Sequence, residues 1–126
     1  MNAYRIRLAG PWEWWDVDQW NRISLPEVVP QRDSKQLRLR RGFHTPSNLD
    51  PDETVSVQIP DSFGEILEVN IDSQPVAASS DREFDLTSQL NDYHHLEVCC
   101  VPLETELTPP ALLIRQVPAR RDLNSK

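Results

Sequence analysis

Apolar and polar residues alternate with a period of two along most of this chain. The alternation is clearest in segments at residues 4–8, 37–40, 55–59, 67–71, 96–100 and 112–114. Because successive side chains of a β-strand point to opposite faces, each segment predicts a strand with one buried face and one solvated face. Ile6, Leu67 and Val69 are among the residues that the alternation assigns to buried faces. The pattern therefore predicts an all-β protein.

Turn-forming residues separate the predicted strands. Glycine, proline, asparagine, aspartate and serine gather at residues 10–11, 46–51, 61–64, 72–75, 91–92 and 109–110. Short strands separated in this way are typical of an antiparallel sandwich or barrel. The best helical candidate is one turn at residues 87–90, with Asp85 or Thr87 as its cap.

The length of the chain sets the number of domains. Its 126 residues match one ordinary domain, which is large enough to fold without metals or disulfides. We expect a single β-sandwich over residues 1–118, followed by a polar tail over residues 119–126.

The net charge of the chain limits the classes of partner that it is expected to bind. The formal net charge is -7 and the isoelectric point is about 4.8, which argues against general binding to nucleic acids or anionic membranes. One basic cluster stands against this background, at Arg32, Lys35, Arg38, Arg40 and Arg41. It is either the solvated face of a strand or a patch for an anion or an acidic partner.

The sequence also bears on the cellular compartment. No window approaches the ~20 apolar residues of a membrane span, and the first residues lack the apolar stretch of a signal peptide. Cys99 and Cys100 are adjacent, so on a strand they point apart and a disulfide between them would be strained. We expect a cytoplasmic protein.

A set of motifs in a fixed order gives a family resemblance. The motifs are L-A-G-P-W at residues 8–12, R-G-F-H-T-P at 41–46, F-D-L-T-S-Q-L at 84–90 and H-L-E-V at 95–98. They resemble the N-terminal sugar-binding-like domain of family 2 glycoside hydrolases, the β-galactosidase and β-glucuronidase group. One departure is Ser73-Gln74, which stands where those domains usually have a glycine turn.

The resemblance implies a galactose-binding-domain-like jelly-roll β-sandwich. It does not imply catalysis, because the catalytic acids of those enzymes lie on a separate (β/α)8 barrel that this chain is too short to contain. We expect a protein that is not an enzyme and needs no cofactor.

Four tryptophans crowd into nine residues and are the most unusual chemical feature. On a strand Trp12 and Trp14 share one face, which we assign to the core, and Trp15 takes the other. Trp15 and Trp20 are better candidates for exposure, and exposed aromatic faces stack on sugar rings. The nearby Glu13 either accepts hydrogen bonds from sugar hydroxyls or belongs to a solvated strand edge.

These observations lead to two hypotheses for function. The first is a non-catalytic carbohydrate-binding module, with its site in loops at one end of the sandwich or on a sheet face carrying Trp15, Trp20, Arg41 and His44. The second is a protein-interaction or self-assembly module that has lost sugar binding.

Metal binding has weak support in the sequence. The adjacent His94 and His95 diverge on a strand and do not form a zinc site by themselves. The loop at residues 48–52 carries oxygen ligands that suit calcium, although such residues also mark ordinary turns. We assign no metal ligand.

Overall fold

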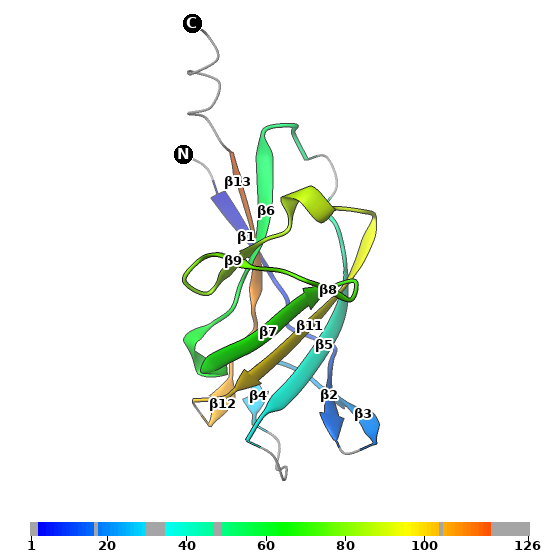
Figure 1. The fold of residues 1–126 in the computed structure, drawn as a ribbon, viewed down its shortest axis with the longest axis vertical. Coiled ribbons are helices and arrows are strands. Elements are labelled where there is room, and N and C mark those ends of the chain that lie inside the picture. Colours follow the sequence, from blue (N-terminus) through cyan, green and yellow to red (C-terminus); the bar gives the residue numbers. More distant parts are fainter. Residues whose placement is uncertain (1–2, 17, 30–34, 47–48, 104, 117–126) are drawn as a thin grey trace, which may run out of the picture.

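Two antiparallel sheets and a small ribbon make up almost all the regular structure in a computed structural model, which describes residues 3–16, 18–29, 35–46, 49–103 and 105–116 (Figure 1). Sheet A contains, in spatial order, β1 (Ala3–Arg7), β13 (Ala111–Gln116), β6 (Glu53–Gln58), β10 (Glu83–Asp85) and β9 (Ala78–Ser80). Sheet B contains β3 (Gln19–Ile23), β2 (Trp12–Asp16), β5 (Leu37–His44), β11 (Tyr93–Val101), β7 (Glu65–Ile71) and β8 (Gln74–Pro75). The ribbon pairs β12 (Glu106–Leu107) with β4 (Glu27–Val28).

Short 3₁₀ turns are the helical elements of the described residues: η1 (Asp61–Phe63) and η2 (Thr87–Gln89). The turn η2 confirms the predicted helical turn, but its N-cap is Leu86 without a side-chain cap hydrogen bond, so the prediction of Asp85 or Thr87 as the cap was wrong. The Asp85 carboxylate instead accepts hydrogen bonds from the Thr87 N–H and hydroxyl. No helix in the described part of the chain has the length and apolar character needed to cross a membrane.

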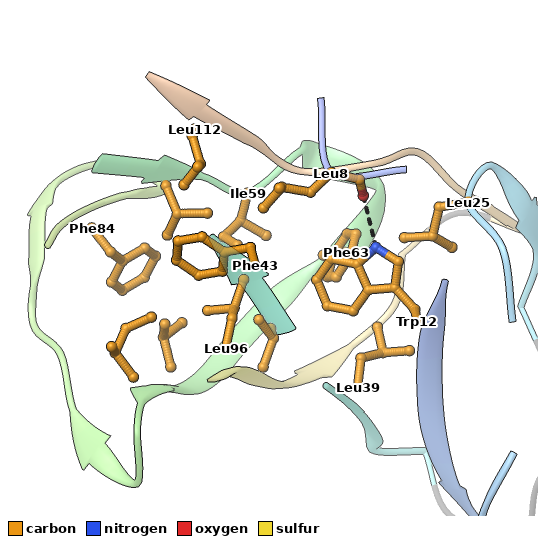
Figure 2. Packing of buried hydrophobic residues seen from close by; sticks show 14 of the residues in the cluster. Leu8, Trp12, Leu25, Leu39, Phe43, Ile59, Phe63, Phe84, Leu96 and Leu112 are labelled. Atoms are coloured by element: carbon orange, nitrogen blue, oxygen red, sulfur yellow. Dashed lines mark hydrogen bonds between the residues drawn. The ribbon is translucent and has the colours of Figure 1, made fainter. Parts of the chain in front are cut away.

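The chain passes repeatedly between the two sheets, as in a jelly roll, and the predicted antiparallel β-sandwich is confirmed. Aliphatic and aromatic side chains from both sheets meet between the layers (Figure 2). The largest side chains sealed there include Trp12, Phe63, Leu37, Leu39, Ile59, Leu96 and Leu112. Trp12 is fully buried and Trp14 packs partly buried against the same core, which confirms the face predicted for them.

Ser56 and Cys99 are buried although the alternation places them on solvated faces, and two apolar side chains predicted to be buried are instead exposed. Leu67 is exposed because β7 has one more residue than β11 here: Glu68 pairs with Cys99 and Ile66 with Cys100, so Leu67 is left between them. Ile6 is also partly exposed, because β1 is the edge strand of sheet A. The prediction that both side chains are buried was therefore wrong.

The hairpin between β7 and β8 forms without glycine. Asp72 and Ser73 both adopt positive φ angles, at 52° and 69°, as a tight hairpin turn requires. Asp72 offsets this backbone strain by accepting hydrogen bonds from the His95 N–H at 2.8 Å and from the His94 ring at 2.7 Å. The predicted turn at residues 72–75 is confirmed, and the departure from the family's glycine turn has a physical basis.

His94 is fully buried at the centre of this arrangement. Its Nε2 accepts a hydrogen bond from the Asn91 N–H at 2.9 Å, so the ring proton lies on Nδ1, which donates to Asp72. Both ring nitrogens are thus satisfied inside the sandwich, and His94 has a structural role.

Some sequence expectations concern residues outside the described ranges. These are Asn48 of the suggested calcium loop, Arg32 of the basic cluster and the tail at 119–126. In the described part of the loop, Asp50 and Glu53 hydrogen-bond to each other as in a turn. Among the described residues, no group of three or more His, Cys, Asp or Glu side chains converges on a metal position.

Candidate functional site

The outward-facing side of sheet B, which we call the outer face, gathers aromatic and charged side chains in cross-strand rows. One row joins Trp15 of β2 to Trp20 of β3. The next joins Arg22, Glu13, Arg40 and Glu97 across β3, β2, β5 and β11. Directly paired residues have Cβ atoms about 5 Å apart, so neighbours in a row lie close together.

Trp15 and Trp20 form an edge-to-face pair, with ring centroids 5.3 Å apart. Trp15 is 40% exposed, while Trp20 is half-buried because the Arg40 guanidinium carbon lies 3.9 Å from its ring centroid. Arg40 is held in place by Glu13, whose Oε1 accepts from Nε at 2.7 Å. The Trp15 indole is therefore exposed to solvent and packs against the Trp20 indole, which Arg40 in turn holds in place.

A hollow of about 380 Å³ lies on the outer face beside this pair. Three arginines and one carboxylate line it together with aromatic rings: Pro11, Glu13, Arg22, Arg40, Arg41, Gly42, Tyr93 and His95. Gly42 leaves room for the Tyr93 ring, since a methyl group at this position would overlap the Tyr93 hydroxyl. The hollow thus combines hydrogen-bond donors with two flat rings.

Arg41 reaches the hollow from an unexpected direction. Its register partner is the fully buried Leu96, so its side chain starts on the inner side of β5. Its guanidinium donates to the carbonyl oxygens of Gly42 at 2.7 Å and Gly10 at 3.2 Å, while its buried Nε has no hydrogen-bond partner among the described residues. Partial burial lowers the pKa of Arg41, because it disfavours the charged guanidinium. No carboxylate of the described residues forms an ion pair with Arg41 that would offset this effect.

His44 lies further along the outer face, away from the tryptophan pair. Its ring meets Tyr93 at 4.7 Å between centroids, and Tyr93 in turn meets His95 at 5.3 Å. His44, Tyr93 and Arg41 also line a second hollow of about 290 Å³, which borders β1. Of the four residues predicted for the site, Trp15 and Trp20 are in contact, Arg41 lines both hollows, and His44 lines only the second.

The basic cluster divides into residues with different roles. Arg38 donates to Glu97 at 2.6 Å, and this hydrogen bond raises the pKa of Arg38 despite partial burial; Arg40 pairs with Glu13. These two match the solvated strand face that the sequence suggests. Arg41 and the exposed Arg22 have no carboxylate partner among the described residues.

Sequence reasoning missed three residues that line the first hollow: Arg22, Tyr93 and His95. Tyr93 and His95 are more than fifty positions from Arg40 and come beside it only because β11 pairs with β5 in one register. No local pattern marks that register, although alternation does put Tyr93 and His95 on the same strand face.

Comparisons with known proteins identify the fold. No family model matches the chain, and no curated protein matches it in sequence. Among solved structures it is similar to a rhamnosidase from Novosphingobium sp. PP1Y, with a TM-score of 0.70 and 10% identity over 91% of this chain and 15% of that one. It is also similar to a β-glucuronidase from an uncultured Clostridium sp., with a TM-score of 0.67 and 11% identity over 92% and 29% of the two chains.

A third similar structure is a glycosyl hydrolase family 2 member from Bacteroides cellulosilyticus DSM 14838, with a TM-score of 0.61 and 15% identity over 89% of this chain and 21% of that one. The chain spans less than a third of the length of each neighbour. The likeness confirms the family resemblance as one of fold: the chain has the sandwich found as one part of these much longer proteins.

Proposed function

We propose that the chain is a non-catalytic carbohydrate-binding module whose site is the outer face of sheet B. The observation that carries the proposal is the exposed Trp15, braced on Trp20 beside the 380 Å³ hollow. An aromatic ring supplies a flat apolar surface for the C–H face of a sugar, and the charged side chains beside it hydrogen-bond to hydroxyl groups.

The make-up of the hollow supports binding over hydrolysis. Glycoside hydrolysis ordinarily needs two carboxyl groups that flank the scissile bond. In the described part of the chain, Glu13 is the one carboxylate that lines the hollow, and it already pairs with Arg40 at 2.7 Å. The enzymes of similar fold are several times longer than this chain, so their activities give no reason to assign a reaction here.

Replacing Trp15 with alanine tests the proposal. We expect binding of a responsive oligosaccharide to weaken roughly tenfold or more, because exposed aromatic anchors commonly dominate binding energy. Isothermal titration calorimetry against neutral and acidic oligosaccharides measures the change. Leu67→Ala is the matched control, since Leu67 lies on β7 of the same sheet and is exposed to a similar degree, 42% against 40%.

The proposal fails if no saccharide of the panel binds, or if Trp15→Ala and Leu67→Ala bind equally well. A protein-interaction module is the second candidate function. It is favoured by two exposed aliphatic side chains, Val28 of β4 at 64% exposure and Leu103, which precedes β12 in the chain, at 76%.

A further inference from the structure

We infer that the hollow on the outer face binds the acidic group of a saccharide, a carboxylate or a sulfate, through Arg22 and Arg41. This inference rests on the proposed function and specifies its ligand. Its basis is the distribution of charge over the residues that line the hollow.

The hollow is basic on a chain that is acidic overall. Among the residues that the structure describes, three arginines and one carboxylate, that of Glu13, line it, although the whole chain has a formal net charge of -7. Glu13 accepts from Arg40, so this pair is mutually neutralised. The positive charge that remains belongs to Arg22 and Arg41.

Of these two arginines, Arg41 gives the stronger support for an anion in the hollow. A half-buried guanidinium normally pairs with a carboxylate, because removing the charge from water is costly. Here Arg41 donates only to the neutral carbonyls of Gly10 and Gly42, and its Nε lacks a partner among the described residues. An anion in the hollow would supply the missing counter-charge for the guanidinium.

Arg22 and the aromatic pair set the size of the ligand. Arg22 is exposed on β3, two positions after Trp20 and on the same face. Same-face neighbours on a strand lie about 7 Å apart. One oligosaccharide could therefore place a sugar ring on Trp15 and the acidic group of a neighbouring sugar in the hollow. We expect an acidic oligosaccharide to bind better than a single sugar.

Matched ligands separate the acidic group from the sugar. The probes are oligogalacturonate and its methyl ester, dextran sulfate and dextran, and poly-glutamate, each titrated calorimetrically into the intact protein at two salt concentrations. We expect at least one acidic saccharide to bind about tenfold more tightly than its uncharged match, with an advantage that shrinks at high salt. The first pair reports a carboxylate and the second a sulfate.

Matched variants assign the residues. Arg22→Gln should remove most of the advantage of the acidic saccharide, whereas Arg5→Gln, which removes the same charge from sheet A, should not. Arg41→Gln should have the same effect as Arg22→Gln. Thermal unfolding of each variant checks that it is folded. If Arg41→Gln does not fold, the result for Arg22→Gln decides the test.

The outcomes distinguish this inference from the proposed function. Equal binding of charged and uncharged saccharides overturns the inference and leaves the carbohydrate module standing. Binding of no saccharide overturns both. Equal binding of poly-glutamate and acidic saccharides, or equal losses in Arg22→Gln and Arg5→Gln, contradicts a site for acidic sugars and indicates nonspecific attraction of polyanions.

Discussion

Replacing Trp12 with alanine is expected to lower the free energy of unfolding by about 3–5 kcal/mol, the range for large-to-small changes at buried aromatic residues. Trp12 is fully buried between the sheets, in the same hydrophobic cluster as Phe63 and Leu39 (Figure 2). Its Nε1–H also donates to the carbonyl oxygen of Leu8 at 2.7 Å, so the variant loses both packing and a buried hydrogen bond.

Chemical denaturation measures this loss of stability. The variant Trp12→Phe separates the contribution of the hydrogen bond from that of the packing. The phenylalanine variant keeps most of the ring but leaves the Leu8 carbonyl without its donor, for which we expect a loss of about 1–3 kcal/mol. Leu67→Ala, at an exposed position, should change stability by no more than about 0.5 kcal/mol. A Trp12→Ala protein as stable as Leu67→Ala would contradict the core described here.

Replacing His94 with alanine is the second change with a large expected effect, a loss of about 2–4 kcal/mol of unfolding free energy. His94 is fully buried, its ring packs 5.4 Å from that of Phe43 between centroids, and both its nitrogens are hydrogen-bonded. The variant leaves a cavity and removes the partners of the Asn91 N–H and one Asp72 carboxylate oxygen. Denaturant unfolding at neutral pH measures the loss.

The hydrogen bond between His94 and Asp72 also predicts that the stability of the fold depends on pH. Partial burial raises the pKa of Asp72, but hydrogen bonds from the His95 N–H and the His94 ring outweigh it and leave the pKa below the ordinary value. A lowered pKa means that Asp72 stabilises the fold above its unfolded value of about 3.9 and that this contribution is lost as the pH falls through the folded value.

Asp72→Asn should therefore show a shallower loss of stability below about pH 4 than the unchanged protein. Glu83, whose pKa is lowered mainly by its hydrogen bond with Arg115, titrates in both proteins, so the difference between them isolates Asp72. Identical slopes of stability against pH in the two proteins would contradict the role assigned to this carboxylate.

Most of the fold could be predicted from the sequence because the period of two is a local property. The exposure of Leu67 could not, since an extra residue in one strand shows itself only against the partner strand. The turn at Asp72 and Ser73 was predicted from residue type, but its hydrogen bonds to His94 and His95 depend on the pairing of β7 with β11.

The candidate site was only partly accessible to sequence reasoning. The exposure of Trp15 follows from its place on the strand face opposite to the buried Trp12 and the partly buried Trp14. The hollow beside it brings together β2, β3, β5 and β11, and it depends on strand register rather than on any local motif. This is why Arg22 was not foreseen.

Nuclear magnetic resonance of the indole N–H groups tests the central claim most directly. Each tryptophan gives one signal, so titration with the oligosaccharide that binds best reports on Trp12, Trp15 and Trp20 in a single experiment. We predict that the Trp15 and Trp20 signals shift with ligand concentration while that of the buried Trp12 stays in place. Saturated binding that leaves the Trp15 and Trp20 signals unmoved would show that the sugar binds elsewhere, and would contradict the site on the outer face of sheet B.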